Sequence, residues 1–130
     1  MKDLSPTEHC YGCGKSNPVG LKLEVHKDGQ ACVARFLPTD MHQGWEGVVH
    51  GGVLATLMDE IMGWALWQNQ IRAVTGRLSI RYYKPAAIGQ EILLRGFVHS
   101  RRGKSVETRA EARSADQSLL AEATAICIIP

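Results

Sequence analysis

The longest patterned stretch of the chain is an apolar segment in which hydrophobic pairs return every four residues. The pairs are Val53/Leu54, Leu57/Met58, Ile61/Met62 and Ala65/Leu66. This spacing predicts a helix that is apolar over much of its circumference, which is typical of a helix buried against other elements. Four glycines precede it, so the stretch from His42 to Trp67 reads as a glycine-rich approach followed by one long helix.

Alternating apolar and polar residues predict strands on both sides of this helix. Before it, Leu21–Val25 and Ala31–Phe36 are expected to form a hairpin that turns at Asp28-Gly29. Four alternating segments follow it: Val74–Tyr83, Gln90–Ser100, Ser105–Ser114 and Leu119–Ile129. Short connections favour antiparallel neighbours. The expected fold class is therefore α+β, an antiparallel sheet of about five or six strands wrapped around one long central helix. So many strands with one helix also favour an oligomer that extends the sheet.

Composition limits the classes of protein to consider. The 130 residues suit a single domain over 1–130, with residues 1–20 as an N-terminal arm. The net charge of +2 is too small to argue for nucleic-acid binding, and the basic residues are interspersed with acids. No stretch of about 18 apolar residues predicts a membrane span. Without an apolar run at the N-terminus, the four cysteines are interpreted as reduced thiols of a cytoplasmic protein.

Cys10 and Cys13 form a C-x-x-C pair in the arm, which is half of a zinc knuckle. No second pair of ligands follows in the sequence, whereas a structural zinc site needs four. A packed turn is therefore favoured over a metal or redox role, and no metal is expected. The role of the pair stays open.

The common catalytic motifs GxSxG, GxxxxGK[ST] and HExxH are missing from the chain. What remains is Gly51-Gly52 at the start of the helix and the pair Asp59-Glu60 near its middle. Free N–H groups at a helix N-terminus can hold a developing oxyanion, and a buried carboxylate can act as general base or as nucleophile. These parts suit hydrolysis of an activated acyl group. The alternative is that the acids face a solvated edge, because an unpaired buried carboxylate is costly.

Seven residues separate Gly52 from Asp59, which is roughly 10 Å along a helix. One carbonyl group needs both within about 3 Å. We therefore expect a homodimer in which Asp59 of one subunit faces Gly52 of the other, if the chain is an enzyme.

Several motifs together resemble the hotdog-fold acyl-CoA thioesterases of the PaaI-like group. They are His50-Gly51-Gly52 with Asp59 nine residues after the histidine, Tyr82-Tyr83-Lys84-Pro85, and Cys10-x-x-Cys13-Gly14 followed by Asn17-Pro18-x-Gly20-Leu21. The resemblance covers nearly the whole chain. It implies a homodimer or a dimer of dimers, an acyl-CoA substrate, and no cofactor other than the coenzyme A of that substrate.

The resemblance also implies roles for single residues. Asp59 is expected to be the general base or nucleophile, and the Gly52 N–H of the opposite subunit is expected to polarise the thioester carbonyl. Thr75 matches a hydroxyl that places the water, although an ordinary strand threonine is the alternative. Many relatives carry Asn or Gln six residues before the histidine, where this chain has Gly44. The neighbouring Gln43 is then the candidate for that role.

Two further residues have structural alternatives. For His50, a structural role that fixes the turn into the helix is favoured over a role as catalytic base. Glu60 points about 100° away from Asp59 and is expected to face a subunit interface or a polar partner. The expected catalytic set is Asp59, Gly52, Thr75, Gln43 and His50.

Basic residues are the candidates for binding the phosphates of coenzyme A, with a solvated surface as the alternative. The expected substrate-binding set is Gly51, Glu60, Arg81, Lys84, Arg101, Arg102 and Lys104. The function that the resemblance implies is a thioesterase releasing free acid and coenzyme A from a small, medium-chain or aryl acyl-CoA. A hotdog hydratase would want a catalytic histidine. The alternative hypothesis is a non-catalytic acyl-CoA-binding or regulatory domain. Such a domain would not require a buried acid at the position of Asp59.

Overall fold

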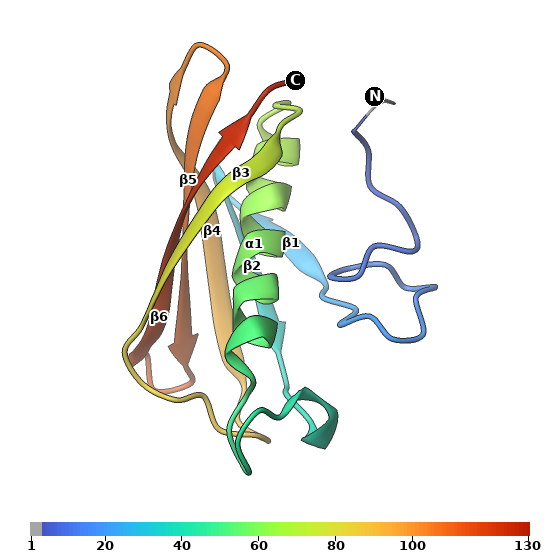
Figure 1. Cartoon of the computed structure of the whole chain (residues 1–130), viewed down its shortest axis with the longest axis vertical. Helices are drawn as coiled ribbons and strands as arrows, with labels where there is room; N and C mark the ends of the chain where they lie inside the picture. Colours follow the sequence, from blue (N-terminus) through green and yellow to red (C-terminus); the bar gives the residue numbers. More distant parts are fainter. Residues whose placement is uncertain (1–3) are drawn as a thin grey trace.

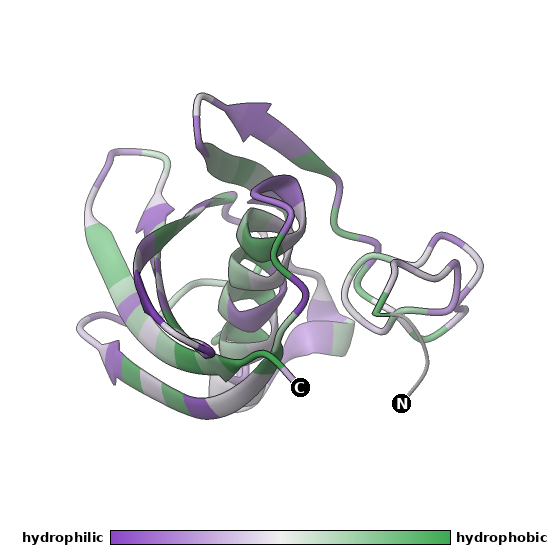
Figure 2. Ribbon diagram, turned by 90° about the horizontal axis from the view of Figure 1, so that it is seen from above, coloured by the Kyte–Doolittle hydropathy of each residue, from purple (hydrophilic) through white to green (hydrophobic). Residues whose placement is uncertain are grey.

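A computed structural model describes residues 4–130 (Figure 1). These residues form one α-helix and six strands: β1 (Val25–Asp28), β2 (Ala31–Phe36), α1 (Gly51–Gln68), β3 (Val74–Tyr82), β4 (Ile92–Arg102), β5 (Ser105–Ser114) and β6 (Leu119–Ile128). All strand pairs are antiparallel, and the order across the sheet is β1-β2-β4-β5-β6-β3. The expected fold class is confirmed, because one antiparallel sheet curls around one central helix in the hotdog arrangement (Figure 2).

The core lies between α1 and the concave face of the sheet. The buried side chains of the helix are those that repeat every three or four residues: Leu54, Leu57, Met58, Ile61, Met62, Ala65 and Leu66. Gly96 of β4 lies directly beneath the helix, where a Cβ atom would come within 2.9 Å of the Ile61 backbone. The absence of a side chain at this position therefore sets how closely the helix approaches the sheet.

The first hairpin differs from the sequence-based expectation. The alternation of Leu21 and Leu23 predicts a strand from residue 21, but β1 begins only at Val25. Leu21 and Leu23 are buried as their pattern implies. Lys22 between them has a φ of 55°, in the left-handed region, so this segment cannot continue a regular strand. The pattern indicated burial correctly and strand geometry wrongly.

The strand β3 lies at one edge of the sheet and pairs only with β6 among the described strands. Its nine residues are mostly exposed, including the apolar side chains of Val74, Leu78 and Tyr82. A long edge strand with open backbone groups and apolar side chains is a surface on which another strand can add.

The N-terminal arm was expected over residues 1–20, and residues 1–3 lie outside the described part. Residues 4–20 form a succession of turns beside α1 (Figures 1 and 2). Backbone bonds from Leu21 N to Tyr11 O and from Leu23 N to Gly12 O join the arm to the segment before β1. Within residues 4–130, no helix combines the length and apolar character that crossing a membrane requires.

Candidate active site

The carboxylate of Asp59 is held by a hydroxyl from the sheet. Asp59 lies near the middle of α1 and is half-buried. Thr75, at the start of β3, donates its Oγ1 hydrogen to Asp59 Oδ1 at 2.8 Å. The two residues that the sequence analysis placed in one site are thus in direct contact. A carboxylate oriented in this way can accept a proton from a water molecule while the hydroxyl fixes its position.

A β-bulge brings Thr75 to the helix side of the sheet. Simple alternation would put Thr75 on the face opposite to Ile80 and Tyr82. Ile80 packs against the core, and the Tyr82 hydroxyl donates to the carbonyl oxygen of Gly51 at 2.7 Å, so both face the helix. The pairing of β3 with β6 shifts register between Thr75 and Arg77, at Gly76. Because a bulge adds one residue to a strand, it reverses the side on which the preceding residues point.

Cys127 of β6 is a neighbour of this pair that the sequence analysis missed. It is buried and is the strand partner of Thr75. Burial raises the pKa of the Cys127 thiol above its usual value, although hydrogen bonding to Thr108 and Thr75 opposes this shift. The thiol is therefore neutral at physiological pH. Only the register of β6 against β3 could have revealed this contact.

At the start of α1, two adjacent glycines differ in whether their amide hydrogen is bonded. His50 is the N-cap residue, and its Nδ1 atom accepts the amide hydrogen of Gly52 at 2.8 Å. The Gly52 N–H is thus engaged in capping the helix and is not free to polarise a carbonyl. The amide of Gly51 has no acceptor among residues 4–130. His50 accordingly fixes the turn, and the free N–H group at this helix N-terminus belongs to Gly51.

Gln43 is engaged within its own loop rather than in the site. Its Oε1 atom accepts the amide hydrogen of Gly47 at 2.6 Å, and its Nε2 atom donates to the carbonyl oxygen of Asp40 at 3.1 Å. Both polar atoms of the Gln43 side chain are thus bonded within the loop, and its expected catalytic role stays a prediction. The adjacent Gly44 leaves little room for a polar side chain, because a Cβ atom there would lie 3.1 Å from the Cα atom of His50.

Asp59 and Gly51 do not meet within one chain. Eight residues of one straight helix separate them, which is about 12 Å along the axis. The carboxylate site and the free amide therefore lie at two different levels of α1.

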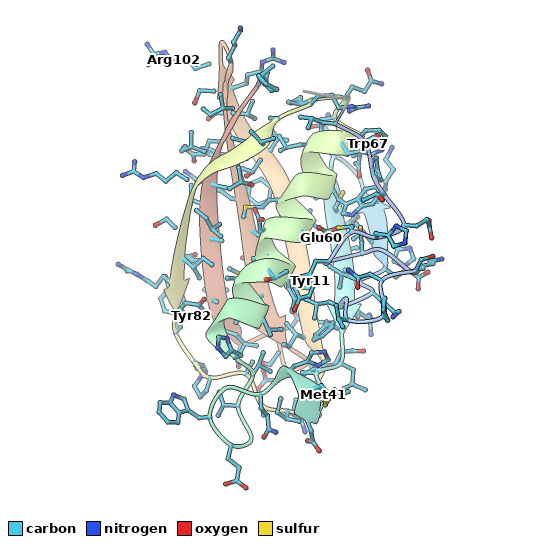
Figure 3. The ribbon with its side chains drawn as sticks, turned by 45° about the vertical axis from the view of Figure 1, so that its right-hand side comes forward. Tyr11, Met41, Glu60, Trp67, Tyr82 and Arg102 are labelled. Atoms are coloured by element: carbon cyan, nitrogen blue, oxygen red, sulfur yellow. The ribbon has the colours of Figure 1, made fainter. Side chains whose placement is uncertain are left out.

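Glu60 lies on the side of the helix that faces the N-terminal arm (Figure 3). Its Oε2 atom accepts the indole hydrogen of Trp64 at 3.1 Å, and the Cys10 thiol lies 3.5 Å from each of its oxygens. The expected polar partner of Glu60 is thus the arm. Glu60 is thus bonded to Trp64 and Cys10, whereas Asp59 is bonded to Thr75, and the expected role of Glu60 in substrate binding stays a prediction.

The basic residues form two groups at opposite ends of the sheet. Figure 3 shows Arg102 at one end of the molecule and Tyr82 towards the other. Arg102 and its neighbours Arg101 and Lys104 lie at the exposed tip of the β4–β5 hairpin. This tip is level with the start of β3, because Ser105 and Val74 both pair with Ile128.

The second basic group lies at the far end of β3. Arg81 pairs with Glu122 across the strands, and Lys84 follows two residues after the strand. The hydrogen bond from Tyr83 to Glu122 raises the pKa of the Tyr83 hydroxyl, while the charge of Arg81 opposes this shift. Arg81 is roughly 24 Å along the strand from Val74, at about 3.4 Å per residue. One chain alone therefore does not gather its basic residues in one place.

Comparison of the sequence with known proteins finds thioesterases by two routes. A sequence model of the thioesterase superfamily matches residues 46–121. The acyl-coenzyme A thioesterase THEM4 of Xenopus laevis is 31% identical over 104 residues, which cover 79% of this chain and 47% of the relative. The chain spans less than half the length of the curated relatives that it matches.

Solved structures share the fold. Protein RHA08564, a thioesterase superfamily protein, has a TM-score of 0.90 and 25% identity, covering 93% of this chain and 63% of its own. The Escherichia coli PaaI protein from the phenylacetic acid degradation operon has a TM-score of 0.80 and 19% identity. The match covers 89% of this chain and 86% of the PaaI chain.

A hypothetical thioesterase from Streptococcus pneumoniae also has this fold. Its aspartate-to-alanine variant has a TM-score of 0.77 and 21% identity, covering 82% of this chain and 89% of that chain. The same protein was solved as a threonine-to-alanine variant and with coenzyme A. The two mutated positions are sixteen residues apart in that chain.

Proposed function

The chain belongs to the thioesterase superfamily, and from this premise we propose that it hydrolyses acyl-CoA thioesters. The substrate would be a small, medium-chain or aryl acyl-CoA, and the products are the free acid and coenzyme A. The observation that carries the proposal is the hydrogen bond from Thr75 to Asp59, which gives a half-buried carboxylate a defined orientation. The name of the Xenopus laevis relative supports the same reaction.

Asp59 acts as the general base in this proposal. It takes a proton from a water molecule held between its carboxylate and Thr75, and the water oxygen bonds to the thioester carbon. The tetrahedral intermediate then breaks its carbon–sulfur bond, and the coenzyme A thiolate leaves and takes up a proton. The Streptococcus pneumoniae variants support the pairing, because Asp59 and Thr75 are also sixteen residues apart.

The amide of Gly51 is the proposed donor to the developing oxyanion, in place of Gly52. It is the first residue of α1, and its N–H has no acceptor among residues 4–130. The helix dipole and an N–H group in this position both favour negative charge. Since Gly51 lies about 12 Å from Asp59 along one helix, the donor would come from a second subunit.

A homodimer built on β3 would bring the two halves together. If β3 pairs antiparallel with its copy over its full length from Val74 to Tyr82, the two-fold axis passes through Leu78. Val74 of one subunit then lies opposite Tyr82 of the other. Because Tyr82 bonds to the carbonyl of Gly51, this pairing places the partner subunit's Gly51 near Thr75.

The same pairing would unite the two basic groups. The hairpin tip with Arg101, Arg102 and Lys104 is level with the start of β3. In the proposed dimer, this level coincides with the end of β3 in the other subunit, which carries the partner's Arg81 and the partner's Lys84. We assign the phosphates of coenzyme A to these cations, since phosphate recognition depends on Arg and Lys side chains. No other cofactor is needed for this reaction.

The test is hydrolysis of a panel of aliphatic and aryl acyl-CoAs, followed by release of the free thiol, with wild type beside Asp59→Asn. Turnover in the wild type that nearly vanishes in the variant, with saturable binding retained in both, is the expected result. Binding without turnover in the wild type would reject the hydrolase and favour an acyl-CoA-binding domain. Equal turnover in both proteins would exclude Asp59 as the base.

A further inference from the structure

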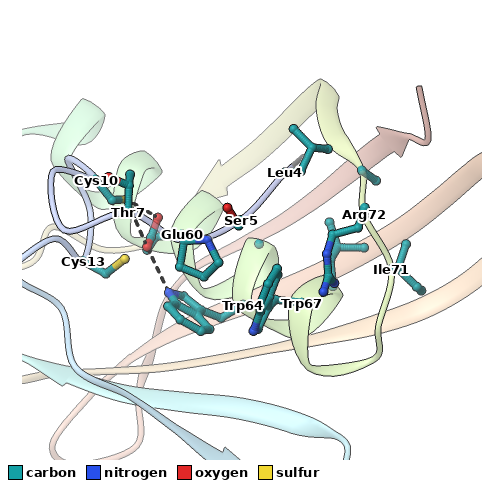
Figure 4. Close-up of a pocket in the computed structure, with 14 residues that line it drawn as sticks. Leu4, Ser5, Thr7, Cys10, Cys13, Glu60, Trp64, Trp67, Ile71 and Arg72 are labelled. Atoms are coloured by element: carbon teal, nitrogen blue, oxygen red, sulfur yellow. Dashed lines mark hydrogen bonds between the residues drawn. The ribbon is translucent and has the colours of Figure 1, made fainter. Parts of the chain in front are cut away.

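Two thiols of the N-terminal arm and one carboxylate of α1 converge outside the proposed active site. Ligand atoms of Cys10, Cys13 and Glu60 all lie within 4.8 Å of one another. Figure 4 shows both cysteines beside Glu60, with the Trp64 indole directed at the same carboxylate. We propose that Cys10, Cys13 and Glu60 bind a zinc ion that fastens the arm to the helix.

The spacing of these atoms suits tetrahedral zinc. Zinc binds thiolate sulfur at about 2.3 Å and carboxylate oxygen at about 2.0 Å, so a tetrahedral site has a sulfur–oxygen separation of roughly 3.5 Å. Cys10 Sγ lies 3.5 Å from Glu60 Oε1 and 3.5 Å from Oε2. The C-x-x-C spacing of Cys10 and Cys13 is also the one that zinc turns use. The sequence contains no second pair of ligands near Cys10 and Cys13, but Glu60 supplies a third ligand from fifty positions after Cys10.

Glu60 has the surroundings of a metal ligand. It is half-buried and forms no ion pair with any residue in 4–130. An acid that is partly removed from water without a cation is unfavourable, and a divalent ion would compensate it. The Trp64 indole donates to Oε2 and fixes the orientation of the carboxylate. Such a second hydrogen bond is typical of carboxylates that bind metals.

Two glycines let the arm reach this position. A Cβ atom on Gly12 would come within 2.6 Å of Glu60 Cδ, so the arm backbone lies directly against the carboxylate. A Cβ atom on Gly14 would lie 2.4 Å from the backbone of Cys10 and Glu8, and the Gly14 amide donates to the carbonyl of Cys10 at 2.9 Å. A side chain at Gly14 would therefore force the turn that presents both thiols to shift.

With three protein ligands, the proposed site resembles zinc sites that bind water in the fourth position rather than closed structural sites with four. The three side chains line a cavity of about 210 Å³ that is also bordered by Trp64 and Trp67. We assign this position to a water molecule. Two thiolates favour zinc over magnesium or calcium, which prefer sites made only of oxygen ligands.

A metal bound here would make the arm part of the folded domain. Cys10 and Cys13 come from the arm and Glu60 from the centre of α1, so the ion cross-links segments that are distant in sequence. Binding that requires both segments to be in place stabilises the folded arrangement.

The test is titration of the metal-free chain, kept reduced, with Co²⁺ alone as a spectroscopic probe. We expect one equivalent per chain, an intense thiolate-to-cobalt band in the near ultraviolet, and displacement of the cobalt by Zn²⁺. The absence of a thiolate band, or uptake of less than one equivalent at saturation, would overturn the proposal. The measurement does not involve turnover, so it is independent of the proposed hydrolysis.

Matched variants decide whether these three residues are the ligands. Trp64→Phe, which removes a hydrogen bond to a ligand, should weaken Co²⁺ binding by roughly 10-fold. Glu60→Gln and Cys13→Ser each remove a ligand and should weaken it more than Trp64→Phe does. The control is Cys32→Ser, whose thiol donates to Gln68 at a distance from the arm, and it should leave binding unchanged. Wild-type affinity in Glu60→Gln would reject the site, and so would an equal loss in Cys32→Ser. If circular dichroism shows that Cys13→Ser does not fold, Glu60→Gln is the deciding variant, because it replaces the carboxylate with a carboxamide of the same shape.

Discussion

The hydroxyl of Thr75 is the feature that gives Asp59 one orientation rather than several. A half-buried carboxylate without such a partner would rotate, and a water held against it would have no fixed direction. We predict that Thr75→Val lowers kcat by roughly 10- to 100-fold, since a hydrogen bond to a charged group contributes about 1.5–3 kcal/mol. Thr75→Ser, which keeps the hydroxyl, should retain most of the activity in the same thiol-release assay.

Two results would contradict this role for Thr75. Equal kcat in Thr75→Val and wild type would leave the threonine as an ordinary strand residue. A loss of similar size in Thr75→Ser would show that the methyl group, rather than the hydroxyl, matters for the site.

At the residue scale, the sequence predicted identities better than contacts. Asp59 could be singled out from the residue pattern, and Thr75 and His50 from the resemblance to the PaaI-like group. The structure joins Asp59 to Thr75 and makes His50 a helix cap. The bonds of Gln43 within its loop and of the Gly52 amide to the His50 cap could not be foreseen, because both depend on the local backbone conformation. The spacing of residues along a chain does not show which backbone amides already donate a hydrogen bond to a nearby side chain.

At the element scale, the distance between α1 and the sheet is set by a glycine. Gly96→Ala would bring a methyl group to 2.9 Å from the backbone and side chain of Ile61. We predict that this variant lowers the free energy of unfolding by about 2 kcal/mol, because overpacking a helix–sheet contact typically costs about 1–3 kcal/mol. Urea denaturation at a fixed protein concentration, with an unchanged slope, measures the effect.

The same helix provides the matched control for Gly96. At Gly63, on the exposed side of α1, an added Cβ atom would meet nothing within 4 Å. Gly63→Ala should therefore stabilise the protein by about 0.5–1 kcal/mol, the difference in helix propensity. If both variants destabilise equally, the close contact at Gly96 is not what limits the approach of the helix.

Periodicity predicted the helix and most of the strands, because these elements have one apolar face each. It failed where the backbone departs from a regular repeat. The segment with Lys22 is buried without being a strand, and the bulge at Gly76 reverses the side on which Thr75 points. Bulges and left-handed residues are fixed by pairing with a neighbouring strand, and a single strand's sequence does not contain that pairing.

At the scale of the whole molecule, the proposed site is divided between two copies of the chain. Asp59 and Thr75 form one half, and the free amide of Gly51 forms the other. Gly51→Pro removes this amide hydrogen with little disturbance, since proline suits the first position of a helix. His50 before it already has a ψ of 132°, which a following proline favours. Gly51→Ala keeps the N–H and is the control for a change of side chain.

Subunit mixing distinguishes a shared site from two sites within single chains. Asp59→Asn and Gly51→Pro should each be nearly inactive, the latter by about 10²–10³-fold in kcat as for loss of one oxyanion donor. Refolded together in equal amounts, they should recover about a quarter of wild-type turnover, because half of the dimers are mixed and each has one intact site of two. Mixing Asp59→Asn with Thr75→Val should recover nothing, since both changes fall in the same half. If the first mixture also stays inactive while a dimer forms, Asp59 and Gly51 do not act across the interface, and pairing through β3 is not what builds the site.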